Sequence, residues 1–317
     1  SLSLGHGASH LYDMGFPVFM EVIAKSLGLS YFQVATLFSI RQVGGGLVSL
    51  GGGALVDTLK SQWGLILTGC MAGSAVAYAF VGASTNFPLL ILAVILVSIP
   101  GALWHLPAAA ALSQRFPDRR GFAIAMHGFG SNIGNVLGPL MAGALLTILF
   151  WRHVLFIYSV PSLMLAGLVW WSLKDVGKEG VQEESVRFSE QLRIGLRLLR
   201  NPVVLGLILS ATLRGIGLNA LFHWTPFYLS DTDTGLGMSY FKAGFHYSLL
   251  AGMGIVSAPV LGLLSDKYGR KAVLVPGLAS AAVLSFLVVS TGDSILLAVV
   301  LAGMGLGPFA LHQIIQA

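Results

Sequence analysis

The sequence predicts an all-α polytopic membrane protein, and three observations lead to this prediction. Of the 317 residues, 55% are hydrophobic and only 10% are charged, whereas a soluble domain carries about 25% charged residues. Apolar runs recur along the whole chain, each near the length of about 20 residues that crosses the bilayer as a helix. The runs do not alternate apolar and polar residues, as the strands of a membrane barrel would. Helices are therefore expected throughout.

Ten apolar runs are predicted as membrane-spanning helices. They lie near residues 4–27, 35–56, 63–84, 88–113, 121–149, 153–173, 202–229, 240–264, 272–291 and 294–317. The first run contains Asp13 and Glu21 and lacks both a basic start and a small-residue cleavage site. It is therefore interpreted as a helix of the mature protein and not as a signal peptide. Cys70, the single cysteine, lies in the third run and is expected to be a small buried hydrophobe rather than a disulfide partner or metal ligand.

Basic residues predict the orientation of these helices. Lys25, Arg152 and Lys242 lie on one side, whereas the loops after even-numbered runs hold Lys60, Arg115, Arg119, Arg120, Lys174, Lys178, Arg187, Arg193, Arg197, Arg200, Lys267, Arg270 and Lys271. The positive-inside rule then places the N-terminus and the central linker in the cytoplasm. The bases are dispersed among short loops and not gathered on one amphipathic face, so the net charge of +5 does not indicate nucleic acid.

A polar segment from Lys174 to Pro202 separates the first six runs from the rest. Ser189 could cap a short helix that places Arg193, Arg197 and Arg200 on one face. Such a helix would either lie on the membrane surface or form a solvated linker, and both interpretations remain open. The predicted domains are a six-helix bundle (1–173), a cytoplasmic linker (174–201) and a second bundle (202–317).

The two halves contain repeated sequence features. The stretch "GGALVD" contains Gly53 and Asp57, which correspond to Gly262 and Asp266 in "GLLSD". Pro17 and Pro226 are separated by the same number of residues as each of these pairs. His105 and His312 are related by almost the same offset. A repeat in the same orientation predicts two parallel, pseudo-symmetric bundles around a site near the middle of the membrane. If the second half also has six helices, this chain lacks the last two of twelve.

The stretch "GLLSDKYGRK" resembles the loop between two helices of the major facilitator superfamily, and the resemblance spans essentially the whole chain. It implies a transporter fold and a cytoplasmic gate formed by Gly262, Asp266, Lys267, Gly269, Arg270 and Lys271, with Gly53 and Asp57 as a degenerate first copy. Gly262 is expected to let two helices approach closely, and Gly269 is expected to support a tight turn. An ordinary cytoplasmic turn is the alternative.

The fifth run reads "GFGSNIGNVLGPLMAGAL", which resembles a motif of antiporters in the same superfamily. The resemblance assigns this role to Gly130, Gly134, Gly138, Pro139 and Gly143. Small residues four apart also allow close helix packing in any membrane bundle, so a purely structural role remains open.

Two further stretches, Ser9–Phe38 and Trp104–Pro139, resemble the fosmidomycin-resistance-like group of that superfamily. The chain departs from that group in the spacing of His10 and Asp13 and in Ala108, where an acidic residue is common. The resemblance implies a proton-coupled transporter of the inner membrane.

Titratable residues inside apolar runs are candidate coupling or substrate groups, because a charge at mid-membrane costs about 2.5–3.5 kcal/mol on insertion scales. His6, His10 and Asp13 share one helix face. A dry cavity favours a neutral carboxylate and a neighbouring imidazolium favours a charged one, so Asp13 could exchange a proton near neutral pH. Alternatively, His10 and Asp13 form a hydrogen bond that only fixes packing.

Five further residues complete the candidate site. Glu21 and Arg41 are expected at similar depth, as a structural ion pair or an outer gate. Arg214 could bind an anionic substrate in bidentate fashion or pair with Asp13. His105 and His312 are candidates for coupling or for plain hydrogen bonds to backbone carbonyls, while structural roles are favoured for His127, His223 and His246.

Catalytic nucleophile motifs, nucleotide-binding loops and metal-ligand clusters are absent from the sequence pattern, so neither an enzyme nor a cofactor is predicted. The predicted function is a secondary active transporter. The predicted partners are membrane lipid, protons and a small drug-like or anionic solute, and the chain is expected to be monomeric. Proton-driven export is favoured. The alternatives are proton-coupled uptake and a membrane receptor or structural protein that retains a transporter fold.

Overall fold

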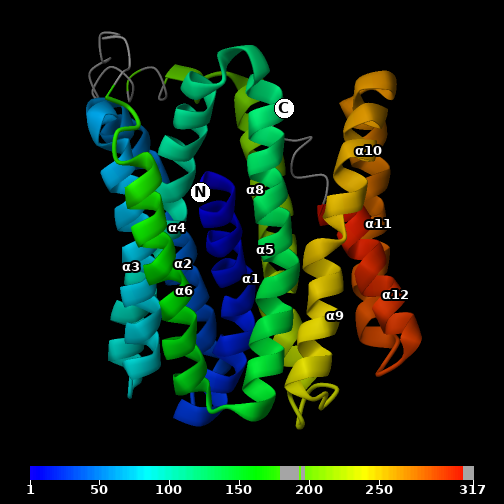
Figure 1. The fold of residues 1–317 in the computed structure, drawn as a ribbon. Helices are drawn as coiled ribbons and strands as arrows, with labels where there is room; N and C mark the ends of the chain where they lie inside the picture. The colour runs from blue at the N-terminus through cyan, green and yellow to red at the C-terminus, as the bar shows by residue number, and fades with distance from the viewer. Residues whose placement is uncertain (179–192, 194–196, 310–317) are drawn as a thin grey trace. The chain divides into compact units, whose positions relative to one another are not determined.

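The computed structural model describes residues 1–178, 193 and 197–309. Within these residues the secondary structure is helical, without strands (Figure 1). The α-helices are α1 (Leu2–Leu27), α2 (Tyr31–Thr58), α3 (Trp63–Ala83), α4 (Phe87–Arg115), α5 (Arg120–Ile148), α6 (Trp151–Leu173), α8 (Pro202–Ser230), α9 (Tyr240–Gly252), α10 (Gly254–Tyr268), α11 (Arg270–Ser290) and α12 (Ile295–Met304). Short helical turns η1 (Lys60–Gln62), η2 (Pro117–Arg119) and η3 (Gly305–Phe309) adjoin them.

The helix ends follow from local sequence. Ser30 and Gln33 form a reciprocal capping box at the start of α2, which satisfies two backbone N–H groups that have no partner within the helix. Asn86 and Ser294 accept hydrogen bonds from the first turns of α4 and α12 in the same way. Gly28 ends α1 with a φ of 62°, a left-handed conformation that glycine adopts without a Cβ penalty.

The predicted run 240–264 is not one continuous helix in the structure. It is interrupted at Met253, between α9 and α10, and it also bends near Pro259 inside α10. The segments Tyr240–Ser257 and Pro259–Tyr268 are bent by 49° relative to each other. Pro259 has no N–H, and its ring collides with the carbonyl group one turn earlier. The bend is therefore expected at this proline. The predicted linker helix around Arg193, and the part of the last run beyond 309, lie outside the described residues.

Six of the described helical segments are long and apolar enough to cross a membrane, and α9 with α10 would make a seventh. They are Lys60–Ala83, Phe87–Arg115, Pro117–Ile148, Trp151–Leu173, Pro202–Ser230 and Arg270–Ser290. α1 and α2 have comparable length, but glycine and polar residues make them less apolar. The chain is a multi-pass membrane protein, and the total of ten spans stays a prediction.

The chain forms two compact units. The first comprises residues 1–9, 24–130 and 150–214. Within it, α3 packs against α4 and α6, and α2 packs against α4 (Figure 1). Its apolar core contains Leu67, Cys70, Met71, Trp104, Ala108, Ala166 and Val169. Cys70 is a free, buried thiol, as the sequence predicts for a small hydrophobe. The hydroxyl of Ser162 donates to the carbonyl of Met71 at 2.8 Å and so joins α6 to α3.

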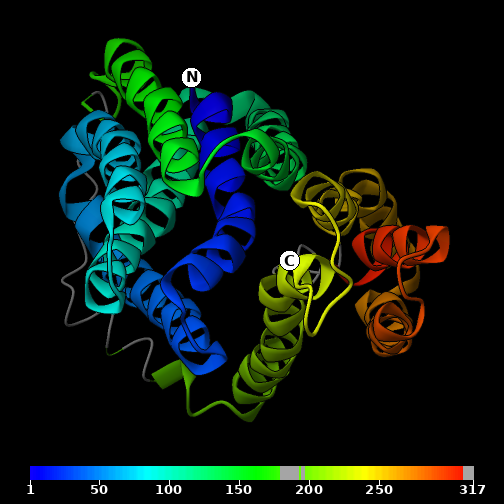
Figure 2. The same ribbon diagram turned by 90° about the horizontal axis from the view of Figure 1, so that it is seen from below.

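The second unit comprises residues 10–23, 131–149 and 215–317. Its helices α9 to α12, coloured gold to red in Figure 2, gather into one group in which α12 packs against both α9 and α11, and α10 packs against α11. The sequence predicts different bounds, namely one bundle at residues 1–173 and a second at 202–317, joined by a linker. This division into domains stays a prediction.

Candidate functional site

Three histidine side chains meet in the first unit, and they are called the histidine cluster below: His6 on α1, His105 on α4 and His127 on α5. The rings of His6 and His127 stack with centroids 4.0 Å apart at an angle of 14°. The ring of His105 lies edge-on to that of His6, with centroids 5.0 Å apart. His6 and His127 are buried, at 8% and 6% exposure, whereas His105 is exposed. The cluster thus joins three helices through titratable side chains.

One hydrogen bond assigns the tautomer of His6. Its Nδ1 atom lies 3.0 Å from the backbone carbonyl oxygen of His127. Because a carbonyl oxygen can only accept, Nδ1 carries the proton and donates it. In the neutral ring, Nε2 is then the atom that can take up a further proton. Two imidazolium charges about 4 Å apart would repel by about 4 kcal/mol at an effective dielectric constant of about 20. Two charged rings at this distance would therefore destabilise the stacked contact.

Glycines bring α1 close enough to α4 and α5 for this contact. A Cβ at Gly130 would overlap the carbonyl oxygen of Ser3, and one at Gly7 would lie 2.9 Å from the carbonyl oxygen of Gly130. A Cβ at Gly5 would overlap the ring of Trp104, which is fully buried. The histidine cluster therefore depends on residues without side chains on both helices. Sequence reasoning gave His127 a structural role near a helix end and missed this contact.

His10 has a partner on α5 within the second unit. Its Nδ1 atom lies 2.8 Å from Oδ1 of Asn135, and the amide oxygen accepts. Sequence reasoning considered Asp13 as the partner of His10 and did not single out Asn135. Asp13 is half-buried on the same helix, and Glu21 is 1% exposed. This segment of α1 therefore holds three titratable residues in largely buried positions.

The glycines of the α5 motif are sites of close backbone approach. Within the second unit, a Cβ at Gly138 would overlap the carbonyl oxygen of Leu11 on α1, and one at Gly143 would overlap that of Tyr240 on α9. The hydroxyl of Ser248 lies 2.9 Å from the carbonyl oxygen of Val136, one turn before Pro139. α1 and α9 thus pack directly against α5. Gly134 lies in the same helix, and the antiporter role of these residues stays a prediction.

The gate motif forms the connection between α10 and α11. Gly269 adopts a φ of 87° between the two helices, the tight turn expected there. Of the charged motif residues, all are exposed: Asp266, Lys267, Arg270 and Lys271. The Nζ atom of Lys267 lies 5.1 Å from the ring centroid of Tyr268. The end of α10 therefore carries four exposed charged residues, and their role as a cytoplasmic gate stays a prediction.

The close helix approach expected at Gly262 stays a prediction. A Cβ at Gly262 or at its first-half counterpart Gly53 would meet no atom of the described chain within 4 Å. The described part of each glycine's own unit therefore supplies no neighbouring helix in close contact with it. Asp57 lies in α2, and its side chain is outside the described set.

The other predicted residues lie in different parts of the chain. Arg41 on α2 and Arg214 on α8 are half-buried in the first unit. Glu21 and Asp13 belong to the second unit, so the proposed pairs Glu21–Arg41 and Asp13–Arg214 stay predictions. His312 lies outside the described residues.

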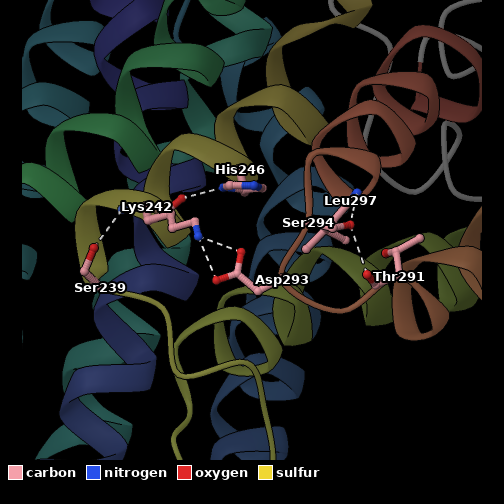
Figure 3. Close-up of polar contacts among 7 residues, drawn as sticks. All are labelled: Ser239, Lys242, His246, Thr291, Asp293, Ser294 and Leu297. Atoms are coloured by element: carbon pink, nitrogen blue, oxygen red, sulfur yellow. Dashed lines mark hydrogen bonds and ion pairs between the residues drawn. The ribbon is translucent and has the colours of Figure 1, made fainter.

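An ion pair that sequence reasoning missed joins the start of α9 to the loop before α12 within the second unit (Figure 3). The Nζ atom of Lys242 in the first turn of α9 lies 2.6 and 2.7 Å from the two carboxylate oxygens of Asp293, between α11 and α12. Nδ1 of buried His246 lies 2.8 Å from the carbonyl oxygen of Lys242. Ser239 caps α9, and Ser294 caps α12. The pair therefore connects two capped helix ends, and His246 has the structural contact expected of it.

Apolar helices with titratable groups buried among them define a polytopic membrane protein of the transporter class. The model of the Major Facilitator Superfamily matches residues 2–316, and the chain belongs to this family. A tetracenomycin C resistance and export protein of Streptomyces glaucescens is 27% identical over 296 residues, covering 75% of this chain and 54% of that protein. An uncharacterized MFS-type transporter of Yersinia enterocolitica is 28% identical over 176 residues, covering 54% of this chain and 41% of that protein. The chain thus spans about half the length of these curated relatives.

Solved structures share the fold. A bacterial homologue of the human lysosomal transporter Spinster, in an inward-facing and unoccupied conformation, superposes with a TM-score of 0.79 at 18% identity, covering 99% of this chain and 73% of that one. The nucleoside transporter NupG gives a TM-score of 0.78 at 16% identity, covering 100% and 82%. A D-xylose-proton symporter gives 0.69 at 15% identity, covering 98% and 79%. At these identities the likeness concerns the fold alone.

Proposed function

We propose that this protein is a secondary active transporter that exports a small drug-like or anionic solute across the cytoplasmic membrane in exchange for protons. The histidine cluster is the observation that carries the proposal. Two of its imidazoles are buried among apolar helices, where a charge is costly, and histidine exchanges protons in the physiological range. A buried side chain that gains or loses a proton near physiological pH changes its charge where a charge is costly. Such a side chain can couple proton uptake to a conformational change.

The carboxylate that carries the coupling proton in this proposal is Asp13. It follows His6 and His10 on the same helix, α1, and is half-buried. Protonation from the outer side would neutralise Asp13 and release the solute, and the neutral form would favour return to the inward-facing state. His6 and His10 would supply further proton sites. Arg214 is the proposed contact for an anionic solute, and the α10–α11 loop is the proposed cytoplasmic gate.

Export is favoured by the family motif in α5 and by the export function in the name of the Streptomyces glaucescens relative. Proton-coupled uptake is the second candidate. It is supported by the contacts of Gly138 and Gly143, whose glycine requirement is accounted for by packing against α1 and α9 alone. In that case the motif carries no information on the direction of transport. The proposed orientation, with the N-terminus in the cytoplasm, follows from the basic loops.

The test is proton flux in proteoliposomes that contain a pH-sensitive dye and the full-length protein. A panel of small anions and drugs, fosmidomycin included, is applied to wild type, Asp13→Asn and Asp118→Asn. Asp118 is an exposed residue of η2, so its variant controls for loss of one carboxylate. We expect solute-dependent flux in wild type and Asp118→Asn and none in Asp13→Asn, and the direction of flux distinguishes export from uptake. Equal flux in all three would exclude Asp13 as the coupling group.

A further inference from the structure

A polar cavity opens in the first unit where α4 and α6 end. Its volume is about 380 Å³. Its wall includes Gln114 and Arg115 from the last turn of α4, Trp171 and Ser172 from the last turn of α6, and Lys174 and Asp175 from the turn that follows. Both helices are long and apolar enough to cross a membrane, so the cavity at their ends is expected where a span leaves the hydrocarbon. None of the proposed coupling residues is among those that line this cavity.

The floor of this cavity is a fixed structure. Val176 packs against a buried cluster of Val56, Trp63 and Ala111, and the indole N–H of Trp63 donates to the carbonyl of Val56 at 2.8 Å. Gly177 has a φ of 87°, and a Cβ there would overlap the carbonyl oxygen of Lys60. The turn after α6 is therefore held against η1 in one conformation, which keeps the shape of the cavity.

The cavity carries an excess of positive charge. Among the described residues that line it, Asp175 is the only acidic one, and it forms an ion pair of 2.7 Å with Lys178. The hydrogen bond from Lys178 lowers the pKa of the Asp175 carboxyl, so this carboxylate is ionised and already compensated at neutral pH. Arg115 and Lys174 make no ion pair with any described residue. Arg115 and Lys174 therefore give the described lining more positive than negative charge, although Lys174 also interacts with Asp175 and helps to lower its pKa.

We propose that this cavity binds the phosphate headgroup of an anionic phospholipid. The guanidinium of Arg115 can bind a phosphate through two parallel hydrogen bonds, and Lys174 adds a second cation to the lining. The ring of Trp171 is 75% exposed, and tryptophan favours the headgroup level of membranes, where it contacts both lipid tails and polar groups. A basic pocket between spans, at the end with the basic loops, is the arrangement that attracts anionic headgroups.

The experiment measures lipid binding to the delipidated full-length protein by native mass spectrometry and by the shift in Tm. The probes are phosphatidylglycerol, phosphatidylcholine with the same acyl chains, and inorganic phosphate. The test variant is Arg115→Gln/Lys174→Gln. The matched control is Arg119→Gln/Arg120→Gln, which removes the same charge from exposed residues next to the cavity that do not line it. Neither pair is assigned to the proposed transport site.

We expect wild type and the control variant to bind phosphatidylglycerol at least fivefold more tightly than phosphatidylcholine, and the test variant to lose most of this preference. Equal losses in both variants would show a general charge effect and overturn the proposal. So would the absence of any preference for phosphatidylglycerol in wild type. If inorganic phosphate raises the Tm as much as phosphatidylglycerol does, the cavity takes a soluble anion, and the lipid assignment is wrong. A folded state of each variant is checked by its helical circular dichroism.

Discussion

The Nδ1 atom of His6 on α1 donates a hydrogen bond of 3.0 Å to the backbone carbonyl of His127 on α5. The acceptor belongs to the main chain, and the donor belongs to a side chain. Substitutions at the two positions should therefore have different effects, although the two rings stack on each other.

His6→Phe should destabilise the protein more than His127→Phe. The first change removes the side-chain hydrogen bond, at a cost of about 0.5–1.5 kcal/mol, while the carbonyl of His127 keeps its backbone partner within α5. The second retains the carbonyl, the hydrogen bond and an aromatic ring for stacking. Thermal unfolding of the two purified variants in one detergent tests this order. A larger fall in Tm for His127→Phe would mean that the imidazole of His127 has a more important contact than the one with His6.

Gly143→Ala should destabilise the fold, because the new methyl group would overlap the carbonyl oxygen of Tyr240. Overpacking of this kind costs about 1–3 kcal/mol. Gly128→Ala is the matched control in the same helix, since a Cβ there meets no described atom within 4 Å. It should be neutral or stabilising by up to about 1 kcal/mol, because alanine is the better helix former. Equal Tm values for the two variants would exclude close packing of α5 on α9 at Gly143.

Lys242→Gln should lower stability slightly. Both side chains of its ion pair with Asp293 are more than 40% exposed, and exposed pairs contribute about 0.2–1 kcal/mol. The charge-swapped variant Lys242→Asp/Asp293→Lys should regain part of the loss, and the difference should shrink as salt is raised to 1 M. A loss that salt does not change would indicate that the lysine contributes through its packing and not its charge.

Asp175→Asn should lower Tm slightly at pH 7 and have no effect in acid. The pKa of Asp175 is lowered from its ordinary value of 3.8 by the hydrogen bond from Lys178. A depressed pKa in the folded state stabilises the protein above the ordinary value and ceases to do so as the pH falls through the lower one. The Tm difference between wild type and variant, followed from pH 7 to pH 3, should therefore decrease toward zero. A difference that grows in acid would reverse this sign.

The fold could be predicted from the sequence because it depends on composition along the chain. Apolar runs report the helices directly, since every backbone polar group in lipid must be satisfied within its own helix. The helices from α3 to α6 begin and end within a few residues of the predicted runs. Local signals also predicted the turn at Gly269, where a tight bend requires a particular backbone conformation. The bend of 49° between Tyr240–Ser257 and Pro259–Tyr268 was missed because a proline can either bend a membrane helix or end it.

The partners of the polar residues could not be predicted in the same way. His6 and His127 are 121 residues apart, and His10 and Asn135 are 125 apart. Their contacts depend on which faces of α1 and α5 meet, and periodicity within one helix does not determine this. The same reason explains why Gly138 and Gly143 are tightly packed while a Cβ at Gly53 or Gly262 would meet no described atom within 4 Å.

The amino-acid sequence alone establishes a multi-pass helical membrane protein and identifies the titratable residues that such a protein must accommodate, because transfer into lipid depends on each segment's own composition. The tertiary structure decides which of these residues meet. It stacks His6 on His127, gives His10 the amide of Asn135, and pairs Lys242 with Asp293. These choices depend on close packing of whole helices, in which the position of a single glycine determines how near two backbones can come.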